Sequence, residues 1–329
     1  MPDLPVAVDA MGGDHAPTAI VDGALAAATG AGLRVALVGP TRVLETELRR
    51  HDADARRRVS VVEAPDVVAM DEAPLAALRR KPRASIRVAL EELAEGRASA
   101  VFTAGHTGAA LLAAHSALGM LPGAERPALA VTIPTATGAA VLLDAGANAD
   151  CRPEHLEQFA VMGAAYARVA LNVDEPTVGL LSIGAEAGKG NDLIREAHAR
   201  LRRLSLRFIG NLEARDLFTG RAQVIVCDGF TGNVALKVSE GLFETVVAML
   251  QDAAGRSSAG APAVEAFLEP FQRRFDYARY GGAPLLGVPG LVVVGHGHSS
   301  ATAVENGIVT AARLASDRVV TRLASALAT

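Results

Sequence analysis

The sequence predicts a protein of the α/β class whose strands form a largely parallel sheet. Apolar runs of strand length, such as Thr177–Ile183, alternate with longer segments in which apolar residues recur at helical spacing. This alternation is typical of βαβ units, which place parallel strands side by side. Glycines and polar residues follow at least five of the predicted strands. The 329 residues suffice for one large α/β domain or for two lobes that share a sheet.

Composition limits both the core and the partners. Half of the residues are hydrophobic but only 4% are aromatic, so the core must be built from Ala, Val and Leu. The formal charge of −4 argues against a protein that binds nucleic acid through bulk electrostatics. We therefore expect partners to be recognised locally.

The cysteines and the N-terminus indicate a cytoplasmic protein. Cys151 and Cys227 lie far apart, in no metal or redox spacing, as expected for a reducing compartment. Met1–Pro5 lacks the basic and apolar regions of a secretory signal. No apolar run approaches the roughly 20 residues that a spanning helix needs. A position on a membrane surface remains open.

The first half of the chain is a regular series of elements. Pro17 stands where the first helix begins, and Gly30 and Gly32 follow its Ala-rich sequence. The predicted helices are Thr18–Thr29, Thr41–His51, Ile86–Glu95, Ala109–Leu118 and Pro153–Asn172. The predicted strands are Leu4–Asp9, Arg34–Gly39, Val59–Ala64, Ala98–Thr103, and the apparent hairpin Leu129–Ile133 and Ala139–Asp144.

The second half continues the series and adds long helices. Strands are predicted at Thr177–Ile183, Leu206–Gly210, Gln223–Cys227 and Gly290–Val294, and helices at Asp192–Leu204, Val234–Leu250, Ala263–Tyr280 and Ala301–Ala326. The stretch Gly255–Gly260 breaks the long helices, and Ala263–Tyr280 carries more than a third of the aromatic residues. Because no clean linker exists, we expect a single domain over residues 1–329, with a helical arm at about 234–280.

The loop after Thr177–Ile183 is the first candidate site. Gly184, Gly188 and Gly190 break the strand, and Lys189 is the only cation inside the loop. Backbone N–H groups and the positive end of the following helix would favour an anion there. The alternative is an ordinary βα turn with a surface lysine.

Other predicted strands also end in glycines and polar residues. Gly12 and Gly13 precede Asp14 and His15, for which the alternatives are a tight turn and a surface histidine. Such loops lie at the carboxyl ends of strands, where α/β folds place ligands. Further candidates are Thr107, Gly108, Asn148, Thr231 and Asn233, with Asp144 and Asp228 expected to orient Lys189 or a backbone loop. His296 and His298 also lie at a strand end; the alternatives for them are membership of the site and an ordinary polar turn, of which we favour the turn.

A basic run, Arg79–Arg83, lies outside this pattern. Four of its five residues are cations: Arg79, Arg80, Lys81 and Arg83. Such a run is commonly a solvated face. The alternative is a rim for a phosphate or for an acidic partner.

Taken in order, these segments resemble the phosphate acyltransferase (PlsX) family over nearly the whole chain. The specific motifs are DAMGGDHAP, from Asp9 to Pro17, and CDGFTGN, from Cys227 to Asn233. Three loops depart mildly from the family pattern. His106 stands where the family usually has Asn, Ser182 and Ala185 replace Asn and Glu in the lysine loop, and Leu212 and Ala214 replace Val and Gly.

The resemblance implies an acyltransferase that moves an acyl group from acyl carrier protein to orthophosphate, giving acyl-phosphate for phospholipid synthesis. It also implies a three-layer α/β/α sandwich of the isopropylmalate dehydrogenase type, a homodimer, and contact of later helices with the membrane. A downstream glycerol-3-phosphate acyltransferase is a further possible partner. No cofactor or metal is expected, and Arg79, Arg80, Lys81 and Arg83 become a candidate contact for the acidic carrier.

This reaction requires positioning of phosphate and stabilisation of an oxyanion rather than covalent work by the protein. We predict Lys189, His15 and Asn191 as catalytic residues. His15 would donate a proton to the departing thiol, or instead cap the helix that begins at Pro17. The predicted phosphate- and substrate-binding residues are Gly12, Gly13, Asp14, Thr107, Gly108, Asn148, Gly184, Gly188, Gly190, Thr231 and Asn233.

Two other functions are weighed against this one. An NAD-linked decarboxylating dehydrogenase would need clustered acids and the Gly-x-Gly-x-x-Gly fingerprint, which the sequence lacks. A non-catalytic scaffold on a membrane surface would act through Ala263–Tyr280. An aromatic stripe of that kind is also typical of a dimer or core face.

Overall fold

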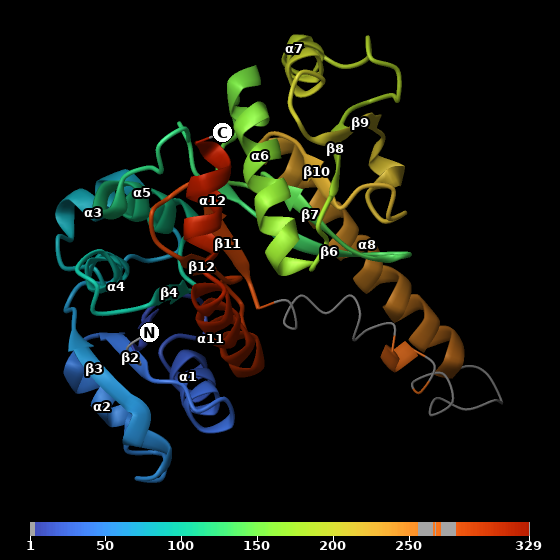
Figure 1. The fold of residues 1–329 in the computed structure, drawn as a ribbon. Coiled ribbons are helices and arrows are strands. Elements are labelled where there is room, and N and C mark those ends of the chain that lie inside the picture. The colour runs from blue at the N-terminus through green and yellow to red at the C-terminus, as the bar shows by residue number, and fades with distance from the viewer. Residues whose placement is uncertain (1–3, 256–265, 267, 271–280, 329) are drawn as a thin grey trace.

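The computed structural model confirms the α/β class, and it distributes the strands over two adjoining sheets (Figure 1). It describes residues 4–255, 266, 268–270 and 281–328. Most of the predicted helix Ala263–Tyr280, including all five of its aromatic residues, therefore lies outside the described residues.

The first sheet has seven strands in the order β3-β2-β1-β4-β12-β11-β5. The strands β3, β2, β1, β4 and β12 run parallel to one another, whereas β11 is antiparallel to both β12 and β5. Their bounds are β1 Val6–Asp9, β2 Val35–Gly39, β3 Val59–Glu63, β4 Ala100–Thr103, β5 Ala128–Leu129, β11 Ala283–Leu286 and β12 Val292–Val294.

The second sheet has five strands in the order β6-β7-β10-β8-β9. Only β6 and β7 pair antiparallel, as the predicted hairpin requires. The bounds are β6 Val131–Thr135, β7 Gly138–Leu143, β8 Thr177–Leu181, β9 Arg207–Leu212 and β10 Val224–Val226. The predicted strand Leu129–Ile133 is divided between the sheets, because the chain passes from β5 to β6 at Ala130, whose N–H donates to the carbonyl of Pro284.

Helices cover both faces of the first sheet because its residues alternate between two cores. Val6 and Val8 pack in the core formed with α1 (Thr18–Gly30) and α11 (Ala301–Ser316). Ala7, between them, faces the core formed with α4 (Ser85–Ala94) and α5 (Thr107–Leu118). The shorter elements on this side are α2 Thr41–Leu48, η1 Ala55–Arg58 and α3 Pro74–Arg80.

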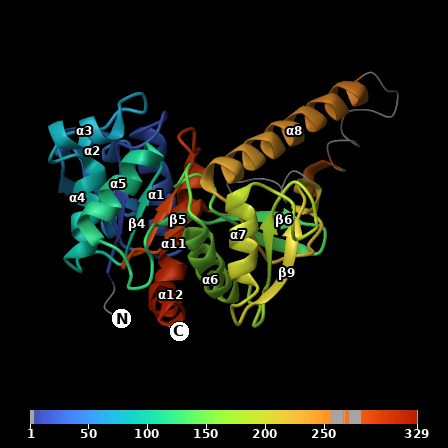
Figure 2. The ribbon, with the colours of Figure 1, turned by 90° about the horizontal axis from the view of Figure 1, so that it is seen from above.

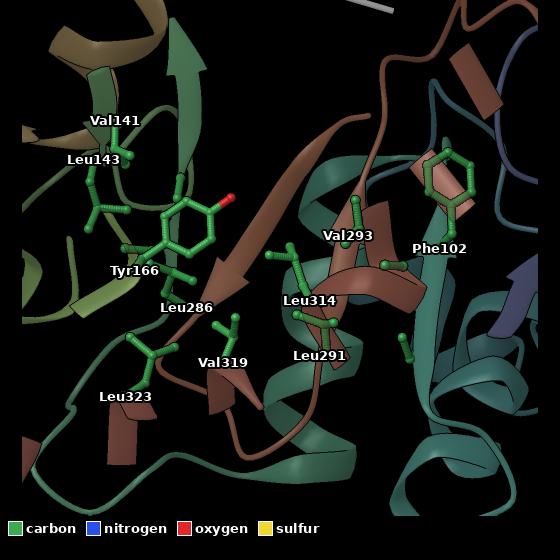
Figure 3. Close-up of a cluster of buried hydrophobic side chains, with 14 of the residues drawn as sticks. Phe102, Val141, Leu143, Tyr166, Leu286, Leu291, Val293, Leu314, Val319 and Leu323 are labelled. Atoms are coloured by element: carbon green, nitrogen blue, oxygen red, sulfur yellow. The ribbon is translucent and has the colours of Figure 1, made fainter. Parts of the chain in front are cut away.

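One core joins the two sheets. Val141 and Leu143 of β7 lie close to Tyr166 of α6 (Pro153–Ala170), and the same cluster reaches Val293 and Phe102 of the first sheet (Figure 3). The helix α7 (Asp192–Leu201) packs beside α6, and η2 (Ala214–Asp216) follows β9. This shared core fixes the carboxyl ends of the two sheets relative to each other.

Two long helices differ from their predicted bounds. The helix α8 begins at Gly229 rather than Val234 and runs to Gly255, extending away from the body of the protein (Figure 2). The predicted helix Ala301–Ala326 is wrong as one element, because Arg318 adopts a left-handed conformation at φ 55°. This break separates α11 from α12 (Val319–Leu327) and lets α12 pack against α6.

Candidate active site

A cavity of about 800 Å³ opens where the carboxyl ends of both sheets meet. Its polar side is formed by the loops after β1, β4, β7 and β12 and by the first turns of α8; the lining residues are Asp14, Gly105, Thr107, Gly146, Asn233, Lys237, Glu240 and Gly295–His298. Its apolar side comes from β5, β6 and α8, with Leu129, Val131, Ile133, Leu236, Phe243 and Val246. Such a cavity can hold an apolar chain and a polar reacting group together.

The loop after β1 is held against the loop after β12. The N–H of Asp14 donates to the carbonyl oxygen of Gly297 at 2.7 Å. Gly13 has φ 109°, and a Cβ there would lie 2.9 Å from that same carbonyl. A Cβ on Gly12 would lie 2.7 Å from both Asp9 Oδ2 and the N of Gly105. Glycine is therefore required here by close packing of the three loops.

A buried hydrogen-bond chain supports the loop after β4. The N–H of Gly105 donates to Thr103 Oγ1 at 3.0 Å, and the Thr103 hydroxyl donates to Asp9 Oδ2 at 2.8 Å. Burial raises the pKa of Asp9 above its ordinary value, although the bond from Thr103 works in the opposite direction. Through Thr103, Asp9 therefore holds in place the loop that carries Thr107.

Asp144 organises the loop after β7. Its carboxylate accepts from the N–H groups of Leu129, Gly146, Ala147 and Asn148 and from Asn148 Nδ2, at 2.8–3.1 Å. Burial raises its pKa, whereas these donors favour the ionised form. Of the two roles expected for Asp144, orienting Lys189 or orienting a backbone loop, the structure shows the backbone role.

Asn148, predicted to bind phosphate, is part of the same structure. Its Nδ2 donates to Pro127 O at 2.7 Å as well as to Asp144, and the residue is buried. Both amide protons are thereby engaged inside the loop. In this arrangement Asn148 supports the wall of the cavity rather than facing into it.

A charged cluster lies on the wall formed by α8 and the loop after β12. Lys237 Nζ and Glu240 Oε2 are 2.8 Å apart, and Glu240 Oε1 lies 3.8 Å from His296 Nε2. The rings of His296 and His298 are 5.5 Å apart. Burial, and then the charge of Lys237, lower the pKa of His296, while Glu240 opposes them.

The structure brings only part of the predicted site together. Asp14, Thr107 and Asn233 line the cavity, and Gly12, Gly13 and Gly108 support its loops. His15 is exposed and is not one of the described residues that line the cavity. Thr231 donates to Asp228 through both its N–H and its hydroxyl at 2.8 Å, so it belongs to the start of α8.

The Lys189 loop lies elsewhere on the second sheet. It follows β8, and β10 separates β8 from β7, which borders the cavity. Lys189 and Asn191 are exposed, and Asn191 Oδ1 caps α7 by accepting from the N–H of Ile194. The described lining contains none of the loop's predicted residues, Gly184, Gly188, Lys189, Gly190 and Asn191. The expected convergence of this loop with Gly12, Thr107 and Asn233 is thus not seen in the described cavity.

Several side chains of the basic run Arg79–Arg83 are paired with nearby residues. Arg80 and Lys81 both pair with Glu72, and Lys81 Nζ also donates to Val67 O. Arg83 donates to Glu63 O at 3.0 Å. Arg79 and Arg80 remain exposed.

Sequence reasoning missed Lys237 and Glu240, and for His296 and His298 it favoured a polar turn over membership of the site. The signal was present: Lys237 and Glu240 stand one helical turn apart, shortly after the motif that ends at Asn233. Over the residues that the structure describes, no group of three or more His, Cys, Asp or Glu side chains is placed to hold a metal ion. No described helix is both long and apolar enough to cross a membrane.

The fold is that of phosphotransacylases. A phosphotransacetylase from Streptococcus pyogenes superposes with a TM-score of 0.66 at 17% identity, covering 95% of this chain and 94% of that one. A putative 4-hydroxythreonine-4-phosphate dehydrogenase from Salmonella typhimurium gives 0.56 at 14% identity, with 94% and 99% covered. The predicted dehydrogenase-type α/β fold is confirmed.

Comparison with known sequences identifies the family of the chain. The profile of the family described as "Fatty acid synthesis protein" matches residues 4–322. Phosphate acyltransferases from Acidobacterium capsulatum and Nostoc punctiforme are 48% and 47% identical, covering 94% and 97% of this chain and 93% and 95% of those proteins. The chain belongs to this family, the predicted phosphate acyltransferase (PlsX) family, and is an acyltransferase.

Proposed function

We propose that the protein transfers a fatty acyl group from the thioester of acyl carrier protein to inorganic phosphate, yielding acyl-phosphate for phospholipid synthesis. The observation that carries this proposal is the two-sided cavity. Its apolar side suits an acyl chain, and its polar side offers the N-terminal turns of α5 and α8, Lys237 and backbone N–H groups to an anion.

The transfer is direct, without a metal, a cofactor or an acyl-enzyme. The phosphate dianion is nucleophilic at pH 7, and a thiolate with a pKa of about 8.5 is a tolerable leaving group. The protein's contribution is to align the two reactants and to stabilise the oxyanion. Incubation with radiolabelled acyl donor alone should leave the denatured protein unlabelled; a stable acyl-enzyme would contradict this mechanism.

The decisive experiment measures phosphate-dependent release of free carrier thiol from palmitoyl-carrier protein. The same assay tests the predicted role of Lys189. Loss of an oxyanion donor raises the barrier by about 2.7–4 kcal/mol, so a Lys189→Ala enzyme that kept near-normal kcat would remove Lys189 from the proposed catalytic set. Arg203→Ala, at an exposed position just after α7, is a matched control.

We propose that the acidic carrier docks beside the cavity mouth at Arg79 and Arg80. Met70 lines the cavity, and Pro74, at the start of α3, lies against Gly108. Charge reversal of Arg79 and Arg80 should raise KM for the carrier-bound donor and spare a small acyl-CoA donor. Equal losses with both donors would indicate a structural effect.

We further propose a homodimer formed through α8. Exposed apolar side chains recur at every fourth position of this helix, which places them on one stripe; they are Phe230, Val234, Val238, Leu242, Val246 and Leu250, with Met249 beside them. Val238→Glu should convert the dimer to a monomer in light scattering, whereas Gln251→Glu, on the other side of the helix, should not. A wild-type monomer would refute the dimer.

We also propose that residues 1–329 form a single domain with a helical arm at about 234–280. The protein is cytoplasmic and associates with the membrane surface, close to a downstream glycerol-3-phosphate acyltransferase. Flotation with liposomes tests the surface association, and failure to float would contradict it.

A further inference from the structure

Acyl transfer to phosphate requires a proton to move. An oxygen of HPO₄²⁻ forms a bond to the thioester carbonyl carbon, the C–S bond breaks, and its electron pair leaves on sulfur. The products, acyl-phosphate and free thiol, balance only if the proton carried by the phosphate reaches that sulfur. A side chain that accepts this proton from the phosphate and then donates it to the departing thiol would assist both the attack and the departure.

We propose that His296 is the catalytic residue that carries this proton from the attacking phosphate to the departing thiol; the inference rests on the proposed function. The imidazole lines the cavity among the polar loops, between the loop after β1 and the first turns of α8. The same side chain can accept a proton through one nitrogen and return it within a single reaction.

The backbone and the charged neighbours of His296 hold it for this role. The N–H and the hydroxyl of Ser299 both donate to the carbonyl oxygen of His296, at 3.0 and 2.6 Å. Glu240 lies between Lys237 and His296, with one carboxylate oxygen toward each. The negative charge of a carboxylate 3.8 Å away stabilises the imidazolium that forms transiently.

The protonation state also suits the first step. Burial and the charge of Lys237 lower the pKa of His296, so the ring is neutral near pH 7 and able to accept a proton. The other charged or titratable groups around it are Glu240 on α8, His298 on its own loop and Asp14 on the loop after β1.

The other histidines near this end of the sheet are less suitable. His15 is exposed and does not belong to the described lining of the cavity. His298 lines the cavity but is exposed, and its ring lies 5.5 Å from that of His296. The half-buried His296 is therefore the assigned residue.

The test compares two leaving groups in the full-length enzyme. His296→Gln should lower kcat with palmitoyl-carrier protein by about 10²–10⁴-fold, the usual contribution of a general acid–base residue. With a palmitoyl thioester of thiophenol, whose acidic thiol leaves without a proton, the loss should be much smaller. His115→Gln, on the exposed face of α5, is the matched control and should behave as the wild type with both donors.

Several results would overturn the inference. Equal losses with both donors would show that His296 does not deliver the proton to the departing thiol, and retention of kcat would show that it has no role; either result overturns the proposal. A loss that depends on the leaving group in His298→Gln instead would assign the proton to His298. If His296→Gln fails to fold, His296→Asn is measured in the same way. A wild type without phosphate-dependent thiol release would overturn the proposed function itself, whereas an active wild type with an unaffected His296→Gln would overturn this inference alone.

Discussion

Asp14 and Gly297 connect the first and last loops of the cavity: the N–H of Asp14 donates to the carbonyl oxygen of Gly297 at 2.7 Å. One of these residues follows the first strand and the other follows the last. The bond brings the motif that begins at Asp9 against the loop that carries His296. The stability of the cavity therefore depends on how closely these two loops can approach.

Gly13→Ala should destabilise the protein. Its φ of 109° disfavours any side chain, and the new Cβ would lie 2.9 Å from Gly297 O and 3.1 Å from Ala104 O. Strain of this kind costs about 1–3 kcal/mol, and urea denaturation should show that loss in the free energy of unfolding. Gly30→Ala, whose Cβ would meet only Glu305 Oε1 at 3.6 Å, should be close to neutral. Equal effects of the two substitutions would contradict the close-packing account.

Asp9→Asn should change how stability depends on pH. Burial raises the pKa of Asp9 above its ordinary value of 3.8, so the folded protein holds this proton more tightly than the unfolded chain. The resulting stabilisation is complete below pH 3.8 and is lost as the pH rises through the folded-state value.

Because Asn cannot ionise, the free energy of unfolding of the variant should improve relative to the wild type as the pH rises above 3.8. Urea denaturation over a pH series measures this difference. Asp71→Asn, at an exposed position, is the control. A difference between Asp9→Asn and the wild type that does not vary with pH would refute the prediction.

His106 serves as the N-cap of α5, with Nδ1 accepting from the N–H of Gly108 at 3.1 Å. His106→Ala should lower the free energy of unfolding by about 0.5–2 kcal/mol, as loss of a capping side chain does. His106→Asn, which restores the residue usual in the family, should retain the cap and the stability. Thermal unfolding distinguishes the two variants, and an Asn variant as unstable as the Ala variant would contradict the capping role.

The pH profile of the acyl transfer should follow the charges around His296. Its pKa lies below the ordinary 6.5, so activity that requires the neutral ring should persist below pH 6.5 and fall at more acidic pH. Lys237→Met removes a nearby positive charge, raises this pKa and moves the acid limb to higher pH.

Glu240→Gln removes the opposing negative charge and should move the same limb to lower pH. His298 and Asp14 also face this region, so the assignment needs a direct measurement. NMR titration of the His296 ring in each variant supplies it. Shifts of the same sign in both variants would exclude this electrostatic account.

Much of the fold was predictable because strand and helix periods are local properties of the sequence. The bounds of α1 and β2 differ from the prediction by one residue at an end, since glycines and Pro17 mark these boundaries. The division at Ala130 and the break at Arg318 had no local signal. Both depend on which surface the next segment meets, the second sheet in one case and α6 in the other.

In the candidate site, too, some residues were predictable from local sequence and others depended on tertiary structure. Asp14, Thr107 and Asn233 were found because glycine-rich strand ends indicate loops at one edge of a sheet. That reasoning treats all carboxyl ends as equivalent, so it also included the Lys189 loop, which β10 separates from the strand beside the cavity.

The sequence by itself determined the α/β class, the family and the glycine-rich loops at the strand ends, because each depends on residues close together in the chain. Only the tertiary structure decided which loops share a cavity. It brought Lys237 and Glu240 of α8 close to His296 of the loop after β12, because strand order and helix packing, rather than sequence separation, set the distances between side chains.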